Sequence, residues 1–172
     1  MSVLLIPNIT KDEGLAVTRQ AAALLQQYGV PVLLAEPALK DQLPGVPVLP
    51  EAQAYRQAGQ VITIGGDGTL LRSGHDCVRY GKPVLGVNLG RTGFLATCEV
   101  EELPEKLRRL AAGDYTLAAR GLLAVSGVGA QWQAQAINDI VVFGQTRMHP
   151  MDYCVYCDGA FVSRYRSDGL VL

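Results

Sequence analysis

One stretch, Val61 to Leu71, limits the possible folds more than any other; it reads VITIGGDGTLL. It opens with β-branched apolar residues, a pattern typical of a buried strand. Three glycines then surround Asp67, and glycine permits both unusual backbone angles and the close approach of a ligand. Thr69 can cap a helix that begins at Leu70. A strand, a Gly-rich turn and a helix N-terminus together predict a phosphate-binding site.

Asp67 is unusual in such a site, because a carboxylate repels phosphate unless a metal or a proton acceptor is needed there. The alternative is a tight turn in which Asp67 is an ordinary turn residue. The strand before the glycines and the helix after them favour the phosphate site. Gly66 and Gly68 would then contact phosphate. Arg72, in the first turn of the helix, either pairs with phosphate charge or is a solvated helix residue.

The first half of the chain alternates between apolar runs and helical patterns. Strands are expected at 3–7, 30–35, 61–64 and 83–88, and helices at about 12–28, 51–58, 70–80 and 101–112. Such alternation predicts parallel βαβ units in a doubly wound, Rossmann-like sheet, in which ligands bind at the carboxyl ends of strands. We therefore predict an α/β domain over residues 1–98.

Two-residue alternation dominates the second half and predicts an antiparallel β domain over residues 99–172. Asp158-Gly159 has the composition of a hairpin turn. We expect ordinary thiols at Cys154 and Cys157, because residues three apart on a strand face opposite sides and no second pair completes a zinc site. The sequence has no obvious metal cage.

Charge and hydropathy narrow the possible partners. The net charge of −1 argues against binding nucleic acid or an acidic membrane through bulk electrostatics. No apolar run is long enough to span a bilayer, and no signal-peptide pattern opens the chain. We therefore expect a cytoplasmic protein with neither nucleic-acid nor membrane partners.

Four segments carry a family resemblance. GGDGTLL resembles the motif shared by NAD kinases, phosphofructokinases and diacylglycerol-type lipid kinases. Residues 136–142 (AINDIVV) resemble the Asn-Glu/Asp motif of NAD kinases, and residues 166–170 (RSDGL) resemble the segment before a Thr/Ser/Gly-rich turn in those enzymes. Residues 86–95 are also similar, with Thr92 replacing a more usual leucine. The sequence is thus identified as a member of the NAD kinase family, of bacterial type.

The resemblance implies a reaction. NAD kinases transfer the γ-phosphoryl group of ATP, or of polyphosphate, to the 2′-hydroxyl of the adenosine ribose of NAD. Asp67 would accept the hydroxyl proton. An ordinary carboxylate suffices, because positioning and charge neutralisation dominate phosphoryl transfer. Mg²⁺ would bridge the ATP phosphates and need few protein carboxylates. The family also implies a homo-oligomer, a dimer or a tetramer.

The resemblance assigns dinucleotide contacts in the second half. It implies that Asn138 binds adenine and Asp139 a ribose hydroxyl; from the residues alone, the pair could equally be a β-bulge or a strand end. It also assigns dinucleotide contacts to His149, Arg166 and Asp168.

Other interpretations of these polar residues stay open. Arg164, Arg166 and Asp168 would share one strand face and could form a surface ion-pair cluster. Arg147 and His149 lie either near the pyrophosphate or in a solvated loop.

Two further functions remain possible. A lipid or sugar kinase would share GGDGT but lack the role of Asn138 and Asp139 in reading adenine. A dinucleotide-binding or assembly module would bind NAD without turnover.

The apolar residues before Leu172 read as the start of a strand, and in the family further strands follow this point. We therefore expect the N-terminal part of a longer kinase, with low activity on its own.

Overall fold

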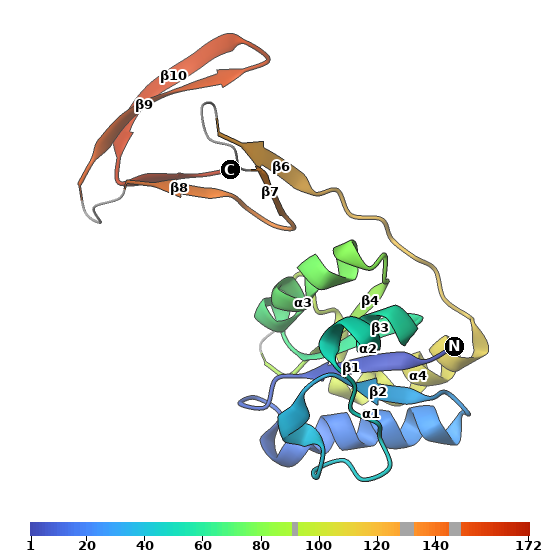
Figure 1. Cartoon of the computed structure of the whole chain (residues 1–172). Coiled ribbons are helices and arrows are strands. Elements are labelled where there is room, and N and C mark those ends of the chain that lie inside the picture. The colour runs from blue at the N-terminus through green and yellow to red at the C-terminus, as the bar shows by residue number, and fades with distance from the viewer. Residues whose placement is uncertain (91–92, 128–132, 145–148) are drawn as a thin grey trace. The chain divides into compact units, whose positions relative to one another are not determined.

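The computed structural model describes residues 1–90, 93–127, 133–144 and 149–172. The chain divides into two compact units, Met1–Ala119 and Arg120–Leu172 (Figure 1).

The first unit is built on a parallel five-stranded sheet with the strand order β2-β1-β3-β4-β5. Its strands are β1 (Val3–Pro7), β2 (Val32–Leu34), β3 (Gln60–Gly65), β4 (Val84–Asn88) and β5 (Cys98–Glu99). This order confirms the predicted Rossmann-like sheet. The chain reverses its direction of winding between β1 and β3, so the carboxyl ends of these strands form the switch point where open α/β sheets bind ligands.

Helices cover both faces of this sheet (Figure 1). They are α1 (Ala16–Gln27), α2 (Glu51–Gln57), α3 (Asp67–Arg79) and α4 (Leu103–Ala112), with short 3₁₀ turns at Glu13–Leu15, Pro37–Leu39 and Val100–Glu102. Alternate strand residues face opposite layers. Leu5 and Ile62 pack in the cluster that contains α1 and α4, whereas Leu4 and Val61 pack with α2 and α3. Each fully buried side chain of this kind contributes about 1.5–3 kcal/mol.

Side-chain and backbone caps set the helix boundaries. The carboxylate of Asp12 accepts hydrogen bonds from the N–H groups of Val17 (3.0 Å) and Thr18 (2.9 Å) and from the Thr18 hydroxyl, so it caps α1. Gly113, at φ 74°, ends α4. The expected cap at Thr69 is wrong: α3 begins at Asp67, two residues earlier.

The first unit extends further along the chain than the boundary that we predicted at residue 98. Helix α4 packs against α1, and its Leu103 and Leu107 are fully buried in the same cluster as strand residues of the sheet. Because this burial ties α4 to the sheet, the division between units falls after Ala119.

The second unit is antiparallel, as predicted. Its strands are β6 (Leu123–Ser126), β7 (Gln133–Ala136), β8 (Val141–Phe143), β9 (Met151–Cys157), β10 (Ala160–Ser167) and β11 (Gly169–Val171). In the described residues they pair as β6–β7, β8–β11 and β9–β10. Asp158 (φ 49°) and Gly159 (φ 81°) form the predicted hairpin turn, because both adopt the positive φ of a type I′ turn.

Many apolar side chains of the second unit are exposed, in contrast to the first. Val141, Phe143, Phe161 and Val171 are each more than half exposed. None of the helices in the described part of the chain combines the length and apolar character that a transmembrane span requires.

Candidate functional site

The loop after β1 is hydrogen-bonded to the Gly-rich turn after β3. The backbone N–H of Asn8 donates to the carbonyl of Ile64 at 2.7 Å, which extends the β1–β3 pairing beyond β1. The side-chain Nδ2 of Asn8 donates to the Thr69 hydroxyl at 3.2 Å. The two segments at the switch point therefore hold each other in place, and Thr69 serves as an acceptor inside α3 rather than as its cap.

Two glycines shape the turn for different reasons. A Cβ on Gly65 would lie 2.8 Å from the Cβ of Asn8, so the close approach of the two segments requires glycine. Gly66 has φ 153° and ψ −173°, a conformation open essentially to glycine alone. The turn delivers the chain directly into α3, whose first backbone N–H groups have no carbonyl partner within the helix. These groups and the positive end of the helix dipole favour an anion.

Asp67 is held by the backbone of a second loop. Its Oδ2 accepts a hydrogen bond from the N–H of Phe94 at 2.9 Å, and its Oδ1 accepts from Leu95 at 3.0 Å and Ala96 at 2.8 Å. A Cβ on Gly93 would lie 2.5 Å from Oδ1, so glycine makes this approach possible. A carboxylate offers about four acceptor positions, so these bonds fix its orientation and leave one position on Oδ2.

The same bonds set the charge of Asp67. Hydrogen bonds from the N–H groups of Ala96, Phe94 and Leu95 favour the ionised form and hold the pKa of the Asp67 carboxyl below its ordinary value, although partial burial opposes them. Asp67 is therefore ionised at neutral pH. An oriented carboxylate with one open acceptor position can take a proton from a bound hydroxyl group.

A pocket of about 500 Å³ lies beside the turn, at the same edge of the sheet. Asn88, at the end of β4, donates through Nδ2 to Glu99 Oε1 at 3.3 Å, and its Oδ1 accepts from the N–H of Gly90 at 3.3 Å. Lys11, from the loop after β1, also lines this pocket. The pocket therefore combines polar groups from three chain segments next to Gly66.

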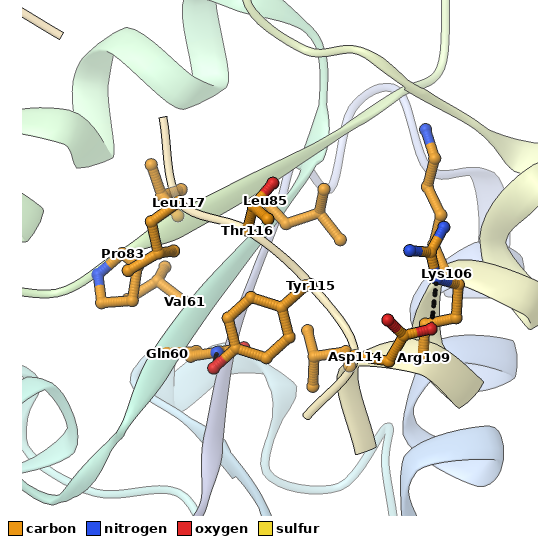
Figure 2. A pocket seen from close by; sticks show the side chains of 12 residues that line it. Gln60, Val61, Pro83, Leu85, Lys106, Arg109, Asp114, Tyr115, Thr116 and Leu117 are labelled. Atoms are coloured by element: carbon orange, nitrogen blue, oxygen red, sulfur yellow. Dashed lines mark hydrogen bonds and ion pairs between the residues drawn. The ribbon is translucent and has the colours of Figure 1, made fainter. Parts of the chain in front are cut away.

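A second pocket, of about 290 Å³, lies at the opposite edge of the sheet, where β3 begins at Gln60 (Figure 2). Gln60 Nε2 donates to the Tyr115 hydroxyl, and Arg109 pairs with Asp114 at 3.0 Å. Apolar side chains such as Val61 form much of its wall. None of the predicted site residues lines this pocket, so its position gives it no part in the predicted chemistry.

The predicted residues of the first unit lie around the start of α3. Gly66, Asp67 and Gly68 are consecutive at its N-terminus, as the sequence indicates. Arg72 is an exposed residue on the same helix, and its guanidinium forms no ion pair within the described residues. Sequence reasoning missed the contact between Asp67 and residues 94–96. Gly93, inside a segment already similar to the family, was the available signal.

Asn138 and Asp139 lie between β7 and β8 and are both exposed. Asn138 Nδ2 donates to Asp139 Oδ1 at 2.6 Å, so the two side chains form one polar group at the entrance to β8. The pair thus occupies the connection between two strands rather than a bulge within one.

Arg164 and Arg166 lie two residues apart on β10 and share one face of it, as expected. The expectation is wrong for Asp168, because β10 ends at Ser167 and Asp168 occupies the bend before β11. Arg164 forms an ion pair with Asp152 at 4.0 Å, and Arg166 and Asp168 are both exposed.

His149 is exposed and lies just before β9, whose first residue, Met151, pairs with Ser167. This register brings the chain near His149 close to the bend that holds Asp168. Arg147 lies outside the described residues.

The cysteines fall into two pairs. Cys77 and Cys98 are buried, and burial raises the pKa of each thiol to about 11. Cys154 and Cys157 are exposed on β9. Among the described residues no group of three His, Cys, Asp or Glu side chains could hold a metal ion.

A doubly wound parallel sheet with a Gly-rich turn at its switch point and an oriented carboxylate at a helix N-terminus defines an α/β protein of the phosphate-binding class. Comparison with known proteins identifies the family. Residues 3–115 match the family model of the ATP-NAD kinase N-terminal domain, and the chain belongs to the NAD kinase family.

Individual relatives agree with this assignment. The chain is 32% identical to an NAD kinase from Corynebacterium diphtheriae and 36% identical to one from Symbiobacterium thermophilum, covering 99% and 95% of this chain. It spans 57% and 60% of the length of these relatives. The structure resembles yeast NADH kinase, solved in complex with NADH, with a TM-score of 0.77 and 19% identity over 99% of this chain and 56% of that chain. This likeness supports the fold.

Proposed function

We propose that the protein acts as an NAD kinase, which transfers the γ-phosphoryl group of ATP to the 2′-hydroxyl of the adenosine ribose of NAD to form NADP. The observation that carries the proposal is Asp67. Its carboxylate lies at the N-terminus of α3, is ionised and is oriented by three backbone N–H groups. Membership of the NAD kinase family selects NAD as the acceptor from among the alcohols that such a site could phosphorylate.

The chemistry follows from this geometry. The 2′-oxygen of NAD forms a bond to the γ-phosphorus while the bond from that phosphorus to the bridging oxygen of ADP breaks, and the hydroxyl proton moves to Oδ2 of Asp67. A carboxylate of low pKa is a weak base, but it is sufficient because the proton leaves late in a loose transition state. Gly66 and Gly68 would let the phosphate chain approach the backbone, with Arg72 as a nearby positive charge.

Mg²⁺ would enter with ATP. Since no cluster of metal-binding side chains occurs among the described residues, phosphate oxygens and water would supply most of its ligands. When bound, Mg²⁺ neutralises part of the phosphate charge.

The second unit would hold the dinucleotide. Asn138 and Asp139, exposed at the entrance to β8, would bind adenine and a ribose hydroxyl. Further contacts would come from the region where β9 begins and β10 ends, that is, from His149, Arg166 and Asp168.

Association between copies would cover the exposed apolar side chains of β8 and β10, and we propose a homo-oligomer, a dimer or a tetramer, in the cytoplasm. Light scattering that finds a single monomeric mass across the micromolar range would contradict this part of the proposal.

The decisive experiment is to incubate the protein with NAD, ATP and Mg²⁺ and to measure NADP. Parallel reactions with inorganic polyphosphate, and with NADH as acceptor, identify the donor and the acceptor. Asp67→Asn serves as the inactive control, and Asp41→Asn, which changes an exposed carboxylate that lines neither pocket, as the matched one. NADP formation by wild type and Asp41→Asn, but not by Asp67→Asn, supports the proposal. NAD binding without turnover by the wild type would indicate a binding module instead.

A further inference from the structure

A short turn after β1 places a cation beside the Gly-rich turn. The backbone carbonyl of Asn8 accepts hydrogen bonds from the N–H groups of Lys11 (3.0 Å) and Asp12 (2.9 Å). The side-chain Oδ1 of Asn8 accepts from the N–H of Thr10 at 3.1 Å. Since Asn8 is also bonded to Ile64 and Thr69, the backbone of Lys11 is tied to the start of α3.

The side chain of Lys11 extends toward Gly66. Its Nζ lies 3.5 Å from the position that a Cβ on Gly66 would occupy. Gly66 immediately precedes Asp67, the first residue of α3. The ammonium group therefore lies at the anion-favouring end of the helix, where the backbone N–H groups point.

Lys11 has no carboxylate partner among the described residues. The carboxylate of the adjacent residue, Asp12, caps α1 instead. Glu13 and Glu99 line the same pocket of about 500 Å³, yet neither forms an ion pair with Lys11. Lys11 is also the only basic side chain that the described residues contribute to this pocket.

A polyphosphate chain bound at this edge needs positive charge. It would meet the carboxylates of Asp67, Glu13 and Glu99, all of which repel it. The dipole of α3 supplies only about half a positive charge, and a single Mg²⁺ neutralises only two of the roughly four negative charges of ATP. A lysine ammonium, a compact charge with three donors, is suited to the remaining phosphate oxygens.

We propose that Lys11 binds the phosphate chain of the phosphoryl donor and holds it against the Gly-rich turn. The inference rests on the proposed NAD kinase function, and it adds a specific residue from the β1–α1 loop. ATP and inorganic polyphosphate share the chemistry that Lys11 would recognise. The Nζ group is placed for the donor rather than for NAD because it lies beside Gly66, in the Gly-rich turn that would hold the phosphate chain.

The test compares Lys11→Gln, Lys11→Arg and a control, Lys40→Gln, which removes the same charge from another exposed site. Lys11→Gln should raise the KM for ATP about tenfold or more, as expected for the loss of charged hydrogen bonds, and leave the KM for NAD unchanged within about twofold. Lys11→Arg should restore most of the loss, because the charge remains. The KM for ATP should rise with ionic strength more steeply in the wild type than in Lys11→Gln. Replacing ATP by polyphosphate shows whether both donors use Lys11.

Failure of this inference and failure of the proposed function give different results. An active wild type whose KM for ATP and for polyphosphate is unchanged in Lys11→Gln overturns the role of Lys11 alone. A rise in the KM for NAD without a rise for the donor overturns the donor assignment.

If the wild type forms no NADP, the proposed function fails, and calorimetric titration with Mg-ATP and with polyphosphate decides the inference. Tighter binding by wild type than by Lys11→Gln supports it. Equal affinity, or no binding by the wild type, overturns it.

Discussion

Replacing Asp67 by asparagine should impair both turnover and the attachment of the loop at residues 94–96. The side-chain oxygen of asparagine can keep the bonds from Leu95 and Ala96, but its NH₂ group would face the N–H of Phe94, donor against donor. A hydrogen bond to a charged group contributes about 1.5–3 kcal/mol. Because Phe94 is 91% exposed, water can replace part of this contribution.

We therefore expect Asp67→Asn to lower the free energy of unfolding by about 1–2 kcal/mol, which corresponds to a fall in melting temperature of about 3–8 °C. Loss of the proton acceptor should lower kcat by about 100-fold or more. Urea unfolding and steady-state NADP formation measure the two effects, with Asp41→Asn as the control. Near-wild-type turnover in Asp67→Asn would sink the assignment of Asp67 as proton acceptor.

The stability effect should depend on pH. The folded-state pKa of Asp67 is depressed, so its stabilisation is present above the unfolded pKa of about 4 and is lost as the pH falls through the folded pKa. Asparagine does not titrate. The stability difference between wild type and Asp67→Asn should therefore shrink as the pH falls below about 4. An equal difference at acid and neutral pH would show that the charge of Asp67 does not strengthen its bonds.

Four further substitutions test other parts of the structure. Gly93→Ala places a Cβ 2.5 Å from Asp67 Oδ1 and should lower kcat roughly tenfold or more; unchanged kcat would mean that the loop adapts. Thr63→Val removes a buried hydroxyl that has no partner in the described residues and should raise the free energy of unfolding by about 1 kcal/mol; a decrease in urea midpoint would refute this. Asn138→Ala should weaken NAD binding by about 1–3 kcal/mol in calorimetry, and equal affinity would make the residue structural. Asp168→Ala should reduce NAD affinity with little change in melting temperature, whereas the opposite pattern would favour a purely structural role.

The first four strands and the α-helices of the first unit could be predicted because each depends on neighbours in sequence, whereas the two-residue strand β5 was not predicted. Apolar runs gave the strands, and the glycines around Asp67 gave the turn into α3. The start of that helix was placed three residues late, at Leu70 instead of Asp67, because the capping preference of Thr69 is a local signal. Its hydroxyl is bonded instead to Asn8, which is 61 residues away.

The rest of the site depends on contacts between distant segments. Asp67 and Phe94 are 27 residues apart, and the one signal in the sequence, Gly93, does not show that backbone N–H groups bind this carboxylate. In the sequence, a lysine in a loop is indistinguishable from an ordinary solvated charge. Only the pairing of β1 with β3 places Lys11 beside the Gly-rich turn. Likewise, period-two alternation runs through Asp168 in the sequence, but the chain bends there before β11 begins.

The positions of the four cysteines allow local unfolding to be measured from their rates of alkylation. Alkylation in the native state should modify Cys154 and Cys157 alone, which restricts a dye or spin label to the second unit. Cys77 and Cys98 belong to the two different buried clusters of the first unit, one on each side of its sheet. Their rates of modification in subdenaturing urea would therefore report separately on the release of each helical layer. One series of measurements on the natural sequence could thus compare the local stability of α3 with that of α4, because no cysteine has to be introduced.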